Sequence, residues 1–275
     1  MKSCDVVTSA LRFLRQSRSG EAIALRASSM DSSPSLPRAS PPKWGAVAPS
    51  AVLCAAAFYC SSVASRRTFS ADANDAPALR DVLHDRFAAG YTDHTNPESP
   101  FFCLPDRIAL AVLASTLGLI FAAHERITWP ACVREACLLL AATQFLRACV
   151  VGVTTFPSPV VMCRGAPELR SVPQPCWIEI YCNDLMFSGH TSVNVASAML
   201  WTFSRVHPAL KILWWTFIVG GCFISVITRD HYSADVVIAL VITVLVGMLR
   251  RERIAAAFAL RGVVGGRADA EQKSD

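Results

Sequence analysis

The chain has 275 residues, of which 17% are charged and 53% are hydrophobic, and its formal net charge is +5. Ordinary soluble domains carry about 25% charged residues, so this composition excludes a disordered chain and argues against a single soluble domain. Eleven cysteines are too sparse for a small disulfide-stabilised scaffold. The weak, scattered positive charge gives no indication of a nucleic-acid partner. The composition therefore indicates an integral, polytopic membrane protein.

Residues 1–44 differ from the rest because they combine basic residues with a Ser- and Pro-rich sequence that has no apolar period. No apolar core of a secretory signal appears before Ser40. We expect a flexible cytosolic tail here. The bias toward arginine and serine is also typical of an organellar targeting segment, so that alternative stays open.

Six apolar stretches follow, and each is close to the length of about 20 residues that a helix needs to cross a bilayer. A lone strand in lipid would leave its backbone unsatisfied, so each stretch is expected to be a helix. The sequence thus predicts an all-α bundle of six transmembrane helices over residues 45–250, followed by a cytosolic tail over residues 251–275. The stretches are Gly45–Ala64, Ile108–Ala123, Ala131–Val153, Phe187–Phe203, Leu210–Thr228 and Tyr232–Leu249.

Basic residues near the ends of the spans predict the orientation of the bundle. An even number of spans places both termini on one side of the membrane. The short connections 124–130 and 204–208 and the C-terminal tail, all on that side, are basic for their length. We therefore expect both termini in the cytosol and the opposite loops in the lumen.

Several cysteines fall in segments expected on the lumenal side, which is an oxidising environment. We expect one disulfide among Cys163, Cys176 and Cys182, with its pairing left open. His84 and His94 lie in a polar loop of mixed charge and are expected to be solvated.

Two histidines are expected at one membrane depth, because each lies at the lumenal start of a span. His190 begins the fourth span, and His231 precedes the sixth. Asp235 follows His231 by four residues, a spacing that places both side chains on one face of a helix. Its carboxylate can hold the imidazole in one tautomer and stabilise the protonated form. Arg147, near the lumenal end of the third span, adds a cation at the same depth.

Ionisable side chains inside a membrane are costly and indicate function by default. Each of these has an ordinary explanation alone: an interfacial histidine can be wetted by the headgroup layer, and an interfacial arginine can extend to water. Together they offer a nucleophile, an orienting acid, a proton donor and a cation for phosphate oxygens. These are the groups that phosphoryl transfer needs.

The sequence around these residues resembles the signatures of the type 2 phosphatidic acid phosphatase (PAP2) superfamily. More narrowly, it resembles the sphingolipid synthase branch, which comprises the sphingomyelin synthases and the inositol phosphorylceramide synthases. The string Cys182-x-Asp184-x-x-x-Ser188-Gly189-His190-Thr191 is similar to the third motif of that branch, and His231-Tyr232-Ser233-x-Asp235-Val236 is similar to the fourth. Leu104-Pro105-Asp106 resembles the first motif, and Arg134, Arg147 and Thr154 match the spacing of the second.

The resemblance covers about residues 100–250, the expected catalytic core, and it is not complete. Glu135 and Gln144 replace an Arg and a Tyr of the second motif, and no aromatic tail follows Val236. In the other motifs, Cys103, Asn183 and Ser233 stand where Pro, Gly and Thr are usual. These departures keep a catalytically inactive, lipid-binding relative as an alternative.

The resemblance implies a PAP2-like helical bundle that transfers a phospho-headgroup from a glycerophospholipid to ceramide and releases diacylglycerol. It assigns the nucleophile to His231, activated by Asp235, and the acid and base to His190. The expected substrate-binding residues are Arg147, Asp184, Ser188, Gly189 and Asp106. Asp106 could equally anchor the second span at the interface. No metal or other cofactor is implied, and the expected place is a Golgi, endoplasmic reticulum or plasma membrane with the active site facing the lumen.

A lipid phosphate phosphatase of the same superfamily, with water as acceptor, is the other alternative. Its first signature, Lys-x6-Arg-Pro, is absent, and Ile224 and Ser225 stand where Ser-Arg would precede the final histidine, so both differences favour the synthase. The headgroup stays open between phosphocholine and phosphoinositol. Residues 156–187 offer aromatic side chains for choline, but their polar residues lean toward inositol.

Overall fold

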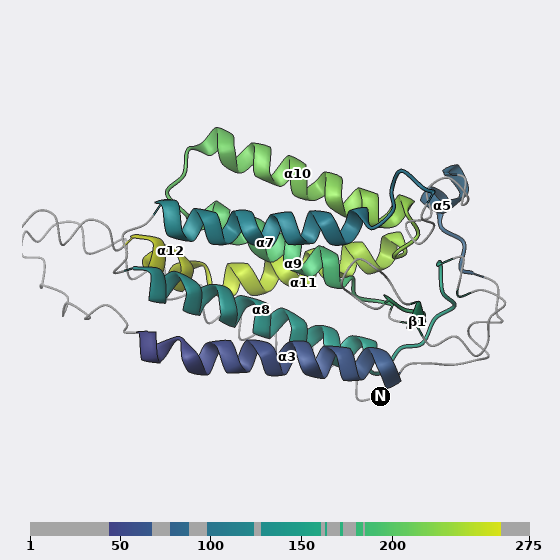
Figure 1. The fold of residues 1–275 in the computed structure, drawn as a ribbon, viewed down its shortest axis with the longest axis horizontal. Helices are drawn as coiled ribbons and strands as arrows, with labels where there is room; N and C mark the ends of the chain where they lie inside the picture. Colours follow the sequence, from purple (N-terminus) through teal and green to yellow (C-terminus); the bar gives the residue numbers. More distant parts are fainter. Residues whose placement is uncertain are drawn as a thin grey trace, which may run out of the picture. The chain divides into compact units, whose positions relative to one another are not determined.

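The computed structural model describes residues 44–67, 78–87, 98–123, 128–160, 163, 171–172, 180–183 and 185–259. All of these residues belong to one unit, which is built almost entirely of helices (Figure 1). The tail predicted over residues 1–44 lies outside the described residues, except for Trp44 at the start of the short 3-10 helix η1 (Trp44–Ala46).

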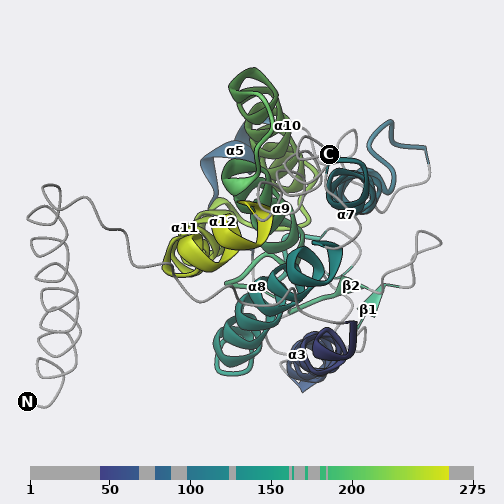
Figure 2. The same ribbon diagram turned by 90° about the vertical axis from the view of Figure 1, so that its left-hand side faces the viewer.

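Six long helices occupy the six predicted apolar stretches, so the all-α class is confirmed. They are α3 (Ala48–Arg67), α7 (Leu104–Ala123), α8 (Trp129–Val151), α9 (Gly189–Phe203), α10 (Pro208–Ile227) and α11 (Ser233–Leu249). The end-on view in Figure 2 shows α9 at the centre, with α7, α8, α10 and α11 around it and α3 packed on α8.

Fewer of these helices meet the length and hydropathy expected of a membrane span than the sequence pattern predicts. Among the described residues, Trp44–Arg67, Leu104–Ala122 and Pro208–Ile227 are each long and apolar enough to span a membrane. The pair Ser233–Leu249 and Arg251–Phe258 meets the same criterion only when taken together as one segment bent by 65°. Three or four helices thus indicate a multi-pass membrane protein, and the count of six spans stays a prediction.

The central helix α9 is buried over its whole middle, from Thr191 to Leu200. Its many small residues allow neighbouring helices to approach closely, as in other membrane bundles. At one such contact, a Cβ atom added to Gly247 of α11 would come within 2.7 Å of the Met199 Cε atom. Close packing along its length keeps α9 in the middle of the bundle, with its first turn at one end.

That end of the bundle, at the right of Figure 1, also carries α5 (Val82–Arg86) and a two-stranded antiparallel sheet. Strand β1 (Ser171–Val172) pairs with β2 (Ile180–Tyr181). A disulfide joins Cys163 to Cys182, which confirms the predicted disulfide and settles its pairing. Cys176 lies outside the described residues.

The opposite end of the bundle is closed by a helix that the sequence analysis did not expect. Residues 251–259, predicted as the start of the C-terminal tail, form α12 (Arg251–Ala259), which packs against α8 and α9. Ile254, Ala257 and Phe258 are buried there. The bend before α12 is tied to α8 by Glu135, whose carboxylate pairs with Arg250 and with Arg134.

We expect the substitution Glu135→Ala to destabilise the fold by about 3 kcal/mol, because Glu135 is only 1% exposed and its loss leaves charged partners uncompensated. Glu252→Ala, on the exposed side of α12, is the matched control and should change stability by less than about 0.5 kcal/mol. Thermal unfolding of the purified proteins in detergent measures both. Equal melting temperatures for the two variants would contradict the structural role of Glu135.

Candidate active site

The residues predicted to be catalytic meet at the end of the bundle that carries α5. The side chain of Ser188 caps α9 by accepting a hydrogen bond from the Thr191 N–H (3.2 Å), which fixes where this helix starts. His190 therefore projects from the first turn of α9. Asp106 lies in the first turn of α7, and Asp235 in the first turn of α11.

His190 is held between two carboxylates. Its Nε2 atom lies 2.7 Å from Asp106 Oδ1, and its Nδ1 atom lies 2.9 Å from Asp230 Oδ2. Because a carboxylate faces each ring nitrogen, the protonated imidazolium is favoured over the neutral ring. This arrangement suits His190 to donate a proton.

His231 lies in the turn just before α11, where Asp235 is its predicted partner. The Nδ1 atom of His231 lies 3.4 Å from Asp235 Oδ2. The Asp235 carboxylate is itself held by the N–H groups of Met186 (3.0 Å) and Tyr232 (3.1 Å). One carboxylate thus fixes the segment before α9 and the turn before α11 relative to each other.

The protonation of His231 is set by opposing effects. Its burial disfavours the charged ring, but the carboxylates of Asp230 and Asp235 outweigh that cost and raise the pKa of His231 above its ordinary value. The neutral ring, which alone is nucleophilic, is therefore reached only at higher pH than for a solvated histidine.

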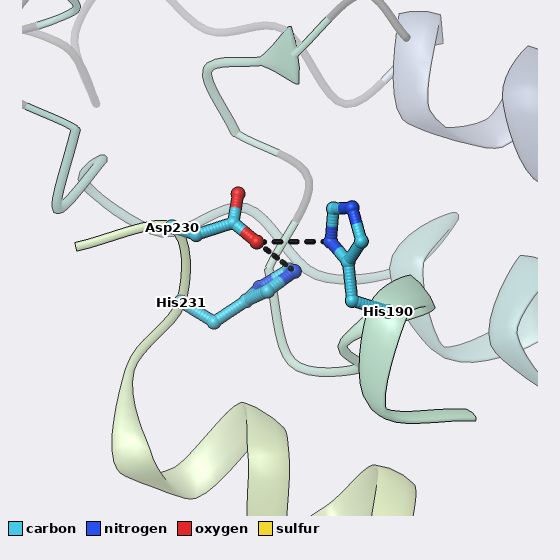
Figure 3. A group of neighbouring side chains, drawn as sticks. All are labelled: His190, Asp230 and His231. Atoms are coloured by element: carbon cyan, nitrogen blue, oxygen red, sulfur yellow. Dashed lines mark ion pairs between the residues drawn. The ribbon is translucent and has the colours of Figure 1, made fainter. Parts of the chain in front are cut away.

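Asp230 is the member of this cluster that the sequence analysis missed. Its Oδ2 atom lies between the two rings, 2.9 Å from His190 Nδ1 and 3.7 Å from His231 Nε2 (Figure 3). The ring centroids are 6.4 Å apart. The sequence does contain a signal for this residue. Asp230 directly precedes His231 at the predicted membrane interface, where an ionisable side chain indicates function.

The same cluster bears on metal binding. Ligand atoms of His190, Asp230 and His231 all lie within 4.8 Å of one another, close enough for one metal ion to be shared among them. The expectation that the reaction uses no metal therefore stays a prediction.

The Arg147 guanidinium is held by groups of the protein beside the start of α9. It donates through Nε to the Phe187 carbonyl (3.2 Å) and through Nη1 to the Ser61 hydroxyl on α3. It also lies over Gly189, where an added Cβ atom would come within 3.3 Å of Nε. Arg147 thus packs beside the start of α9, and Asp184 lies outside the described residues.

A segment far away in the sequence packs over the turn that carries His231. His84 of α5 is only 4% exposed, and its Nε2 atom lies 3.1 Å from the His231 carbonyl oxygen. The prediction that His84 is solvated was therefore wrong, because the polar loop folds back onto this turn. His94 lies outside the described residues.

Further contacts strengthen this packing. The Asp81 carboxylate accepts hydrogen bonds from the N–H (2.7 Å) and the hydroxyl (3.0 Å) of Ser233. Arg229 donates through Nη2 to the His84 carbonyl (2.7 Å), and the Leu79 N–H donates to the Tyr232 hydroxyl (3.0 Å). Residues 79–87 thus hold both sides of His231 in place.

Comparison with known proteins agrees with this site. Residues 181–251 match a family model described as PAP2 superfamily C-terminal. The matched range contains His190, Asp230, His231 and Asp235, whereas Asp106 and Arg147 lie outside it. This part of the chain therefore has the sequence pattern of the C-terminal region of the PAP2 superfamily.

Among individual proteins, the chain is similar to three kinds of ceramide phosphotransferase. It is 27% identical over 128 residues (43% of this chain, 38% of the relative) to a phosphatidylethanolamine:ceramide ethanolaminephosphotransferase of Trypanosoma brucei brucei. It is 28% identical over 118 residues (38% and 36%) to a phosphatidylinositol:ceramide inositolphosphotransferase of Oryza sativa subsp. indica. It is 24% identical over 190 residues (59% and 51%) to phosphatidylcholine:ceramide cholinephosphotransferase 2 of Homo sapiens.

These alignments cover between about a third and a half of the length of the relatives. Within that part, they confirm the resemblance to the sphingolipid synthase branch of the PAP2 superfamily that the motifs indicated.

We expect Asp81→Ala to loosen the turn around His231 without unfolding the bundle. Hydrogen–deuterium exchange at residues 230–235 should become about tenfold faster or more, because a hydrogen bond to a charged acceptor contributes about 1.5–3 kcal/mol. Asp85→Ala, which removes an exposed carboxylate paired with Arg80 on the same segment, is the control. Unchanged exchange in the Asp81 variant would show that residues 79–87 do not hold this turn.

Proposed function

We propose that this chain is a ceramide phosphotransferase, which moves a phospho-headgroup from a glycerophospholipid to ceramide and releases diacylglycerol. The observation that carries the proposal is the pair of imidazoles arranged about one point, His231 buried and His190 partly buried, each backed by its own carboxylate. The named activities of the similar proteins support it. The two lipids that react would both reach the site from within the membrane.

In the first step, His231 Nε2 attacks the phosphorus of the donor. The bond between phosphorus and the glycerol oxygen breaks, and protonated His190 gives its proton to the departing oxygen. The products are diacylglycerol and a headgroup phosphate bonded to His231. Asp235 would hold the Nδ1–H of His231 and stabilise the positive charge that develops on the ring.

In the second step, His190 is neutral and accepts the proton of the primary hydroxyl group of ceramide. The ceramide oxygen attacks the phosphorus, the bond to His231 breaks, and the phosphosphingolipid leaves. His190 ends protonated, as it began, so the cycle is balanced. Water would compete as acceptor unless the lipid hydroxyl is held next to phosphorus.

In this scheme, Asp230 acts on the site before the donor binds. Its carboxylate lies where the transferred phosphate must lie, and two anions cannot share that position. We infer that Asp230 keeps His190 protonated before the donor binds and withdraws when the phosphodiester arrives. Arg147, Ser188, Gly189, Asp184 and Asp106 remain the proposed substrate-binding set, with Arg147 acting from beside Gly189 and Asp106 through His190.

The proposed setting is a Golgi membrane with the site facing the lumen. The Cys163–Cys182 disulfide lies at the same end of the bundle as the site, and disulfides form in such oxidising compartments. For the headgroup we propose phosphoinositol or phosphocholine, with the polar residues Glu168, Arg170 and Gln174 favouring inositol.

We expect membranes that contain the protein to convert labelled ceramide to one phosphosphingolipid when supplied with the right donor. Phosphatidylinositol, phosphatidylcholine and phosphatidylethanolamine are supplied separately, and diacylglycerol, free headgroup phosphate and lipid product are measured. His231→Ala should abolish all three products while inserting normally. Free headgroup phosphate as the main product at saturating ceramide would identify a phosphatase, and no product with any donor would identify an inactive relative.

The pH dependence should report the role of Asp230. Because the nucleophile must be neutral, kcat/KM should rise with pH through the raised pKa of His231. Asp230→Asn removes one carboxylate that raises this pKa, so the acidic limb of the profile should move to lower pH. Asp85→Asn, which alters an exposed carboxylate on α5, should leave the limb in place. An unmoved limb in the Asp230 variant would contradict the coupling.

A further inference from the structure

An apolar groove runs along the bundle where α7 and α8 both pack on α9. The end-on view shows α7 and α8 standing apart on this side (Figure 2). The groove has a volume of about 110 Å³. Its rim includes Leu113 (39% exposed) and Leu117 (49% exposed), and its floor includes Ile120 and Leu200, which are nearly fully buried. It therefore opens sideways, toward the lipid around the bundle.

The described residues that line the groove offer no free polar group to water, although two hydroxyl groups lie in its wall. Thr116 donates to the Val112 carbonyl (2.8 Å) and is also bonded to Ser197. Ser197 in turn accepts a hydrogen bond from Trp214 Nε1 (3.2 Å). Both hydroxyls are thus engaged within the protein. An apolar cavity without partners for water favours a hydrocarbon occupant.

The groove is aligned with the catalytic histidine. Leu113 follows Asp106 by seven residues on α7, and Val193 follows His190 by three residues on α9. At 1.5 Å per residue, the groove begins about 10 Å from Asp106 and about 5 Å from His190 along these helices. On the same helices, Ile120 lies about 21 Å from Asp106, and Leu200 lies about 15 Å from His190. A lipid whose reacting oxygen faces His190 would extend its chains over this distance.

Packing rather than the hydrophobic effect must decide what the groove holds. A chain that moves from the bilayer into the groove exchanges one apolar environment for another, so the transfer itself gains little. What differs is the fit of the chain against the wall, where each missing contact loses dispersion energy. The groove is therefore suited to select and align a chain that is already in the membrane.

We propose that this groove holds one acyl chain of the glycerophospholipid donor. The inference rests on the proposed function, in which the donor is the first lipid to bind and its glycerol oxygen is the one that His190 protonates. With the chain in the groove, that oxygen is fixed beside His190 while the phosphorus faces His231. The groove thus sets the chain-length preference of the first step.

The test narrows the groove and measures chain preference. Ala136→Phe fills it from α8, and Ala114→Phe makes the same change on the exposed side of α7, outside the groove. Full-length proteins in mixed micelles are assayed with donors of 8- and 16-carbon acyl chains at fixed ceramide. Ala136→Phe should lower the ratio of kcat/KM for the long donor to that for the short donor by about tenfold, as for small changes in other apolar pockets. Ala114→Phe should not change this ratio.

The acceptor arm of the test varies the acyl chain of ceramide at a fixed donor. If Ala136→Phe changes the preference for ceramide chain length instead of the preference for donor chain length, the assignment to the donor is overturned. If Ala136→Phe changes neither preference, the groove is overturned as a binding site. If Ala136→Phe fails to fold, Leu117→Ala widens the rim and should raise the relative rate with methyl-branched donors by about tenfold. An unchanged relative rate would count equally against the proposal.

A second measurement separates this proposal from the proposed function. A phosphatidylcholine with a photoactivatable group in the middle of one acyl chain is cross-linked to the wild-type protein. Labelling of α7 and α9 between residues 113 and 120 and between 193 and 200 supports the groove even if no ceramide product forms. Labelling confined to other helices overturns it even if the enzyme is active.

Discussion

Five ionisable side chains, four of them buried and His190 partly buried, lie together at the edge of an apolar bundle, and the rest of the site depends on how their charges compensate one another. Asp106, Asp230 and Asp235 supply three carboxylates, and His190 and His231 can carry two positive charges. Removing any partner would leave a buried charge without compensation, which costs several kcal/mol. The cluster is therefore a single unit, in which each charge is compensated by a neighbouring one.

That dependence reaches the backbone. Asp235 binds the N–H groups of Met186 and Tyr232 with the same carboxylate that faces His231. The entrance to α9 and the start of α11 are thus fixed by a side chain that also takes part in the proposed chemistry. The small-residue surface of α9 then allows four helices to converge near His190. The Asp235 carboxylate therefore contributes both to the packing of the bundle and to the geometry of the site.

Much of this could be predicted from sequence, because apolar length and motif spacing are local signals. The six helices and the meeting of His190, His231 and Asp235 follow from them. The position of Asp230 between the rings depends on side-chain orientations that no spacing encodes. The segment around His84 was missed because loops have no hydrophobic period. In contrast, Ile254, Ala257 and Phe258 carry the helical spacing of α12, and the three arginines just before them obscured it.

The contacts between residues 79–87 and residues 229–233 also have a consequence for how the protein is made. They join positions about 150 residues apart, such as Asp81 and Ser233. The first of these segments leaves the ribosome long before α9, α10 and the turn that carries His231 exist. Residues 79–87 therefore cannot form their contacts with residues 229–233 until the intervening helices have inserted. The packing around His231 can therefore be complete only when the last long helix has entered the bundle, so this end of the molecule takes its final form late in synthesis.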